Sequence, residues 1–131
     1  MDNQTVSLLQ TLKAGAISGF IGMGLNHGWS IVAQQLGSVA PEGFTMAVTI
    51  SSVFPILIAA VVYYLMIKFL KKGKSVFVVL GSLFLLFSLY GPLQPIMPDG
   101  SPTPEGFALL TIPMHFISGI TAIAGIIRWS K

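Results

Sequence analysis

The amino-acid sequence predicts an all-α fold, an integral membrane four-helix bundle that forms a single transmembrane domain over residues 1–131. Of its 131 residues, 53% are hydrophobic and only 8% are charged, whereas a soluble domain carries about 25% charged residues. The hydrophobic residues gather in runs that lack the alternation of a β-barrel strand, and a helix satisfies its own backbone polar groups in lipid. The four runs are Ala14–Val32, Phe44–Ile67, Val76–Gly91 and Phe107–Ile127.

The first helix is predicted over residues 12–35. Ser38-Val39-Ala40 resembles a signal-peptidase site, but the apolar run before it is long for a signal peptide, and Pro41 is expected to block cleavage. We therefore interpret the run as a retained helix. The leucines within residues 8–12 are interpreted as its extension into the membrane interface.

One face of the first helix carries small residues and an amide. Gly15, Gly19, Gly22 and Asn26 follow one another at spacings of four, three and four, which aligns them on one side of a helix. Small residues let helices approach closely in lipid. We therefore expect this face to contact another helix, either in the same chain or in a homodimer formed through Gly15, Gly19 and Gly22. His27 is turned by about 100° from Asn26 and cannot point the same way.

The second and fourth helices, predicted over residues 43–70 and 105–129, begin with the same four residues. Pro41-Glu42-Gly43-Phe44 recurs as Pro104-Glu105-Gly106-Phe107. A duplicated helical hairpin, whose halves are related by an axis along the membrane normal, is one explanation. The other is that Pro-Glu-Gly suits any helix start, because proline begins helices and an acidic first turn favours the dipole. Both explanations stay open at this point. Pro55 and Pro113 are expected to kink these helices.

The third helix is predicted over residues 74–91 and is marginal in length, because about 20 helical residues are needed to cross a bilayer. The segment Leu93–Glu105 that follows it is rich in proline. We expect part of this segment to complete the crossing and the rest to cover the bundle as a lid.

The charged residues indicate how the bundle lies in a membrane. All seven basic residues lie near the N-terminus, around the second loop or near the C-terminus, and three of the four acids lie in the other two loops. By the positive-inside rule both termini are cytoplasmic, and the chain is a multi-pass protein of the inner (plasma) membrane. The expected partner is therefore the lipid bilayer, with anionic head groups near the basic clusters. This layout argues against a nucleic-acid partner.

Most polar side chains within the predicted helices lie near the extracytoplasmic side, whereas the half nearer the cytoplasm is almost purely aliphatic. Thr111, His115 and Ser118 form one stripe on the fourth helix, because they are spaced by four and three residues. We therefore expect an outward-facing polar pocket, closed below, that binds a small molecule or an ion. Its candidate ligand-binding residues are Asn26, His27, Ser30, Thr49, Ser52, Ser88, Tyr90, Thr111, His115 and Ser118.

Asn26, Ser88, Gly91-Pro92 and Met114-His115 resemble the pattern of an uncharacterised family of small four-pass bacterial membrane proteins, a domain of unknown function. That pattern has an early intramembrane Asn, a Ser before a Gly-Pro at the end of the third helix, and a Met-His early in the fourth. The resemblance implies four helices over nearly the whole chain and a shared site that includes Asn26 and His115. It implies no activity, and His27 is not part of the pattern.

These features favour ligand binding with a link to transport. The alternative is a non-catalytic accessory or structural subunit that packs against a membrane partner. A bis-histidine haem protein is a lesser alternative, because His27 and His115 could ligate iron but no basic residue lies outside to pair with the propionates. No cofactor and no metal site is predicted, since the sequence has no cysteines and two histidines fall short of the usual zinc ligands. No serine lies in a hydrolase-like arrangement, so the sequence argues against an enzyme without deciding the question.

Overall fold

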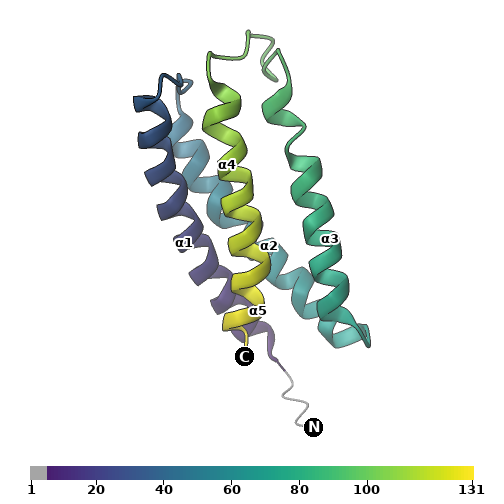
Figure 1. Cartoon of the computed structure of the whole chain (residues 1–131). Coiled ribbons are helices and arrows are strands. Elements are labelled where there is room, and N and C mark those ends of the chain that lie inside the picture. Colours follow the sequence, from purple (N-terminus) through teal and green to yellow (C-terminus); the bar gives the residue numbers. More distant parts are fainter. Residues whose placement is uncertain (1–5) are drawn as a thin grey trace.

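The computed structural model describes residues 6–131 as a bundle of helices that run alongside one another (Figure 1). The first helix begins earlier than residue 12, the third ends before residue 91, and the fourth is interrupted by a π-helical turn. In chain order the elements are α1 (Leu8–Gln35), α2 (Phe44–Phe69), α3 (Gly73–Ser88), the 3₁₀ turn η1 (Gly91–Leu93), α4 (Phe107–Ile120), the π turn η2 (Thr121–Gly125) and α5 (Ile126–Trp129).

Four helical stretches are long and apolar enough to span a membrane, so the chain has the make-up of a multi-pass membrane protein. They are Leu8–Gln35, Phe44–Phe69, Gly73–Leu93 and Phe107–Trp129. Large apolar side chains are exposed on all four, which a surface in contact with water does not tolerate over such an area. Examples are Phe20, Ile31, Phe54, Phe69, Phe84, Phe87 and Ile120.

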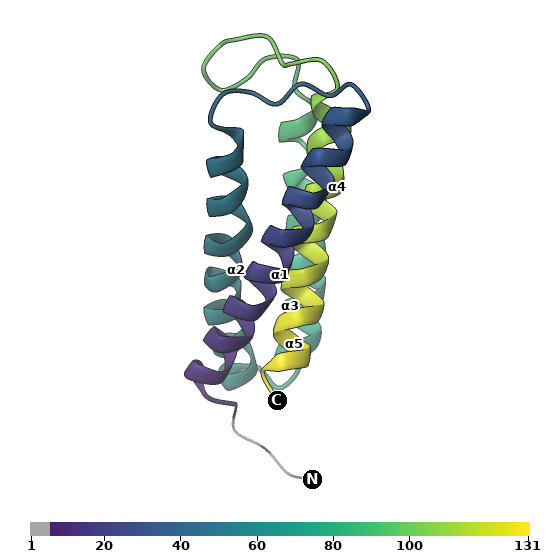
Figure 2. The same cartoon turned by 90° about the vertical axis from the view of Figure 1, so that its left-hand side faces the viewer.

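The start of α1 and the end of α5 lie at the same end of the bundle, as Figures 1 and 2 show. We call this end, which also holds the turn between α2 and α3, the terminal end. The connections over residues 36–43 and 89–106 lie at the opposite end, which we call the loop end.

A capping box sets the start of α1 at Leu8. The Ser7 hydroxyl oxygen accepts a hydrogen bond from the backbone N–H of Gln10 at 3.2 Å, and the Gln10 side-chain oxygen accepts one from the N–H of Ser7 at 2.7 Å. These bonds satisfy two of the donors that every helix N-terminus leaves unpaired. The leucines before residue 12 therefore belong to the helix.

The glycines of α1 are used within the chain. A Cβ on Gly15 would lie 2.7 Å from the Ala60 Cβ, and one on Gly19 would lie 3.1 Å from the Val53 Cα, so α1 and α2 pack with their backbones in close approach. A Cβ on Gly22 would lie 2.9 Å from the Thr121 hydroxyl oxygen. Within the chain this face therefore packs against α2 and η2, and a homodimer through Gly15, Gly19 and Gly22 stays a prediction.

Trp29 donates to the backbone carbonyl that Pro113 leaves without its usual N–H donor in α4. A proline has no N–H to donate to the carbonyl four residues earlier, which here is that of Leu109. The Trp29 indole N–H donates instead to the carbonyls of Leu109 at 3.2 Å and Leu110 at 3.1 Å. Trp29 thereby connects α1 to α4 at the loop end.

The π turn η2 lets α4 pack closely on α1 at the terminal half of the bundle. Its first residue, Thr121, donates its hydroxyl to the Ile117 carbonyl at 2.8 Å, and its last, Gly125, lies against the Ser18 side chain. A side chain on Gly125 would collide with Ser18. Neither Pro113 nor this turn ends the helical path, which continues to Trp129.

The two Pro-Glu-Gly-Phe copies adopt the same conformation. Gly43 and Gly106 both have left-handed backbone angles, with φ of 73° and 68°, and each precedes the first residue of a helix. The two phenylalanines that follow, Phe44 and Phe107, pack edge to face with ring centroids 6.4 Å apart. Their local symmetry agrees with both explanations of the repeat, because a shared helix-start motif would look the same. The duplicated hairpin therefore stays a prediction.

Helix α3 is the least packed of the four helices. It meets α2 at the terminal end, where the Tyr63 and Phe77 rings lie 4.9 Å apart and Gly73 fits against the Met66 carbonyl. It meets η2 at Gly81, which lies opposite Ile123, and α4 at Gly119, which lies opposite Leu85. Figures 1 and 2 show α2 and α3 diverging from their shared turn toward the loop end.

The connection over residues 89–106 folds on itself at the loop end. Ile96 and Pro102 form an isolated antiparallel bridge, and the Thr103 hydroxyl donates to the Gln94 carbonyl at 2.6 Å. At its tip the hydroxyl and N–H of Ser101 donate to the Asp99 carboxylate, which lowers the pKa of Asp99. The segment thus forms a compact loop of its own.

Candidate functional site

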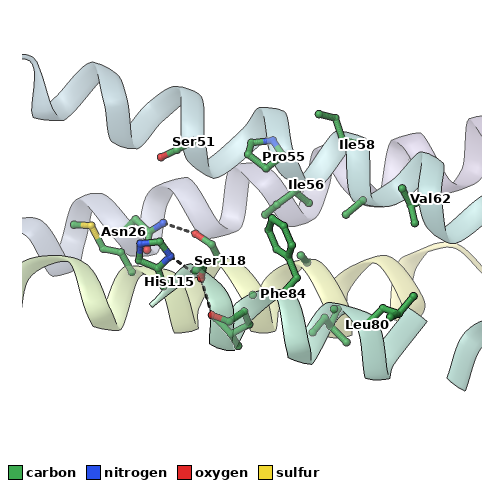
Figure 3. A pocket seen from close by; sticks show the side chains of 18 of the residues that line it. Asn26, Ser51, Pro55, Ile56, Ile58, Val62, Leu80, Phe84, His115 and Ser118 are labelled. Atoms are coloured by element: carbon green, nitrogen blue, oxygen red, sulfur yellow. Dashed lines mark hydrogen bonds between the residues drawn. The ribbon is translucent and has the colours of Figure 1, made fainter. Parts of the chain in front are cut away.

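A cavity of about 690 Å³ lies between α2, α3 and α4, with one residue of α1 at its base (Figure 3). Ligand sites in proteins have volumes of about 300–1,000 Å³ and are lined mainly by apolar side chains with a few polar groups. This cavity has that make-up. Its polar lining residues are Asn26, Ser51, Ser88, Thr111, His115 and Ser118, and the remaining lining is apolar.

Asn26 is the buried centre of the polar end. Only 2% of its surface is exposed, because the small residues of α1 bring this face against α2 and α4. Its side-chain nitrogen donates to the hydroxyl oxygens of Ser52 at 2.8 Å and Ser118 at 2.9 Å. Its side-chain oxygen is buried and has no partner among residues 6–131. A buried acceptor without a donor is costly, by about 1–3 kcal/mol.

His115 lies beside Asn26 at the same end of the cavity (Figure 3). Its Nδ1 is 2.9 Å from the Ser88 hydroxyl oxygen, and that hydroxyl donates its single proton to the Leu85 carbonyl at 2.6 Å. Ser88 can therefore only accept from the ring, so Nδ1 carries the proton. In the neutral imidazole Nε2 is then an acceptor, and no group in residues 6–131 donates to it.

A proline also interrupts the backbone hydrogen bonds of α2 beside the cavity. Pro55 lies within α2 and has no N–H for the carbonyl of Ser51, and both residues line the cavity. No side chain in the described part of the chain donates to this carbonyl, in contrast to the Leu109 carbonyl that Trp29 serves. The side-chain acceptors of the polar end therefore come from α1 and α4.

The rest of the cavity is apolar and extends toward the terminal end. Figure 3 shows Ile56, Ile58, Val62, Leu80 and Phe84 along it, on the side away from Asn26 and His115. None of its lining residues, all within the described range, is Lys, Arg, Asp or Glu. Along α3 the lining runs from Ser88 to Phe77, roughly 16 Å at 1.5 Å per residue.

The cavity is closed on two sides and open on the third. Contacts between α3 and α4 close one side, and the buried cluster that joins Val48 to Leu110 and Met114 closes the side between α2 and α4. Between α2 and α3 the Tyr63–Phe77 contact closes only the terminal end. Nearer the loop end the lining residue Phe84 is 74% exposed, so the cavity opens sideways between these two helices.

The structure brings five of the ten predicted site residues to this cavity, namely Asn26, Ser88, Thr111, His115 and Ser118. A sixth, Ser52, lies directly behind and accepts from Asn26. The expected meeting of Asn26 and His115 in one cavity is therefore present in the structure.

The other four predicted residues lie elsewhere. The ring of His27 pairs with the Thr49 hydroxyl at 3.0 Å on another face of α1 and α2. Ser30 is buried against its own helix and accepts from the Gln34 side chain, while Tyr90 is 70% exposed. None of the four lines the cavity. Residues at a similar depth along the helices point in different directions around each helix axis, so depth alone does not bring them to one side.

Two expectations about the shape of the pocket differ from the structure. The polar pocket was expected to be closed below, yet the cavity continues as an apolar channel past His115. The proline-rich segment Leu93–Glu105 was expected as a lid, yet it contributes no lining residue. Reasoning from polar side chains also missed Ser51 and Phe84. The proline at position 55 was the signal for Ser51, because it frees the Ser51 carbonyl.

The two histidines do not share a site, since His27 pairs with Thr49 and His115 lies with Ser88. No group of three or more His, Cys, Asp or Glu side chains within residues 6–131 is arranged to hold a metal ion.

Comparisons of the chain with protein-family models, with curated proteins and with solved structures find no match. The family resemblance of the sequence therefore stays a prediction.

Proposed function

We propose that this chain is a membrane protein that binds a small molecule in the cavity between α2, α3 and α4, with Asn26 and His115 as its polar contacts. The observation that carries the proposal is the buried Asn26 side-chain oxygen, which has no donor in the described chain. Interhelical packing alone would favour an apolar residue here, because an unsatisfied buried acceptor destabilises a fold. In the structure this oxygen has almost no accessible surface, so we propose that the Asn26 amide turns toward the adjoining cavity and that a ligand there supplies the missing donor.

The distribution of charge supports a membrane orientation with both termini cytoplasmic. Basic residues cluster at the terminal end, whereas Glu42, Asp99 and Glu105 lie at the loop end. This asymmetry is the positive-inside pattern. We propose the inner (plasma) membrane as the location, with the polar end of the cavity in the extracytoplasmic half.

The cavity favours binding over the passage of a polar solute. Beyond His115 its lining residues are apolar, and its terminal end is closed by the Tyr63–Phe77 contact. A polar solute or an ion would meet no hydrogen-bonding group along this stretch and would have to give up its hydration. The bis-histidine haem alternative loses its geometric basis, because His27 and His115 face different surroundings.

The test is native mass spectrometry of the chain extracted from its membrane in mild detergent. We expect a bound small molecule on the parent chain and its loss in His115→Phe and Asn26→Leu. The matched control is His27→Phe, which removes the histidine outside the cavity and is expected to retain the bound molecule.

Two outcomes would contradict the proposal. One is a parent chain that carries no small molecule and instead co-purifies with a stoichiometric protein partner, which would favour the accessory-subunit alternative. The other is a bound molecule that persists equally in His115→Phe, Asn26→Leu and His27→Phe.

A further inference from the structure

We infer that the ligand is an uncharged amphiphile with a hydroxyl-bearing head group, which enters sideways from the bilayer between α2 and α3. The inference rests on the proposed function, since it specifies what the Asn26–His115 cavity takes. It follows from three features of the cavity: the acceptors at its polar end, the absence of charged residues from its described lining, and the position of its opening between α2 and α3.

The polar end of the cavity contains acceptors that a hydrogen-bond donor on a ligand would satisfy. Two side-chain acceptors there have no donor among residues 6–131, the His115 Nε2 and the Asn26 oxygen, which is shielded until its amide turns toward the cavity. Two hydroxyls lack an assigned acceptor at this end, that of Ser118 and that of Ser52 behind it, because each receives a bond from Asn26 and donates none. A ligand hydroxyl matches such a set, because it donates to one acceptor and accepts from a neighbouring hydroxyl.

The lining excludes a charged head group as a match. No Lys, Arg, Asp or Glu lines the described cavity, so a phosphate or a carboxylate would be buried without an opposite charge. A ketone or an ester head carries only acceptors, so it can accept from the Ser118 hydroxyl but leaves the His115 Nε2 without a donor. A head with hydroxyl groups, as in a monoacylglycerol, an isoprenoid alcohol or a hydroquinone, satisfies the site.

The apolar part of the cavity fits a hydrocarbon tail. It extends roughly 16 Å along α3 from the level of Ser88 to Phe77. Its side opening lies between helices whose outer surfaces carry exposed apolar side chains, such as Phe54 on α2 and Phe87 on α3. A molecule dissolved in the bilayer can therefore enter tail and head together without crossing water.

Two phenylalanines of α3 provide a matched pair for the test. Phe84 lines the cavity and is 74% exposed, whereas Phe87 does not line it and is 77% exposed. The chains Phe84→Trp and Phe87→Trp, each measured against the parent with its two natural tryptophans, are reconstituted into vesicles of unbrominated phosphatidylcholine. A monoacylglycerol with a brominated acyl chain, which quenches a nearby indole, is added in increasing mole fraction. The methyl ester of the same brominated acid is the control without donors.

In Phe84→Trp we expect the monoacylglycerol to reach half-maximal quenching at about one-tenth of the mole fraction that the methyl ester needs, the ratio that one to two net hydrogen bonds supply. In Phe87→Trp the two probes should quench alike and only in proportion to their amount in the bilayer. Adding His115→Phe to Phe84→Trp should remove the preference for the monoacylglycerol.

Equal quenching of Phe84→Trp by both probes would overturn the head-group assignment. Equal quenching of Phe84→Trp and Phe87→Trp by the monoacylglycerol would overturn entry from the bilayer. If in that case the small molecule seen by native mass spectrometry is still lost in His115→Phe, the proposed function stands and the ligand comes from water. If the small molecule is also absent, the proposed function fails as well.

Discussion

Replacing Asn26 with leucine is predicted to abolish ligand binding while leaving the empty chain at least as stable as before. The two effects separate because the amide makes two hydrogen bonds, to Ser52 and Ser118, yet keeps one buried oxygen without a partner. A residue retained only to hold helices together would not show this combination.

The magnitude follows from these groups. Hydrogen bonds between membrane helices average about 0.6 kcal/mol each, so the substitution loses about 1.2 kcal/mol. It also removes an unsatisfied buried acceptor, which costs about 1–3 kcal/mol. The freed hydroxyls of Ser52 and Ser118 can bond to carbonyls of their own helices. The free energy of unfolding should therefore stay roughly constant or rise by up to about 2 kcal/mol.

The assay is equilibrium unfolding of the delipidated chain in mixed micelles with an increasing fraction of SDS, followed by far-ultraviolet circular dichroism. Binding is followed in parallel by native mass spectrometry. If Asn26→Leu lowers the free energy of unfolding by more than about 2 kcal/mol, the amide oxygen is satisfied in the folded chain. Asn26 would then be a structural contact between helices, and the central argument for a ligand site would be lost.

Two further predictions concern packing and topology. Gly15→Ala should destabilise the chain by about 1–3 kcal/mol, because the new methyl would lie 2.7 Å from the Ala60 Cβ; Gly24→Ala, which meets nothing within 4 Å, should instead stabilise it by about 0.5–1 kcal/mol through helix propensity. The same SDS titration measures both, and equal effects would contradict the packing of α1 on α2. Because the chain has no cysteines, Glu42→Cys and Lys74→Cys each provide a single thiol for a membrane-impermeant maleimide. Intact cells should label only Glu42→Cys, and the opposite pattern would reverse the proposed orientation.

The sequence was sufficient for the helices, because each depends on nearby residues. An apolar stretch in lipid must satisfy its own backbone, so hydropathy located all four spans. Local signals also determined where helices begin, as at Gly43 and Gly106, which start α2 and α4 in the same left-handed conformation. The periodicity of α1 correctly placed Gly15, Gly19, Gly22 and Asn26 on a buried face.

The lining of the cavity was predicted only in part, because a helical periodicity states which residues share a face but not which neighbour that face meets. Asn26 and His115 were placed together correctly, since each lies on a small or polar stripe of its own helix. His27 and Thr49 have the same depth and chemistry, yet they pair with each other away from the cavity. The sequence contained no sign of the π turn at Thr121, whose residues pack against α1 in the structure.

By itself the sequence determined four spans, their caps and the level at which polar groups lie, because these depend on contacts within a few residues. Tertiary structure decided which side of each helix faces a neighbour, and that α2 and α3 diverge beside a long cavity that opens between them. The physical reason is that apolar helices in lipid gain little from burying apolar surface. Their rotation and spacing are instead set by close contacts between residues far apart in the chain, such as Gly15 with Ala60 and Trp29 with Leu110.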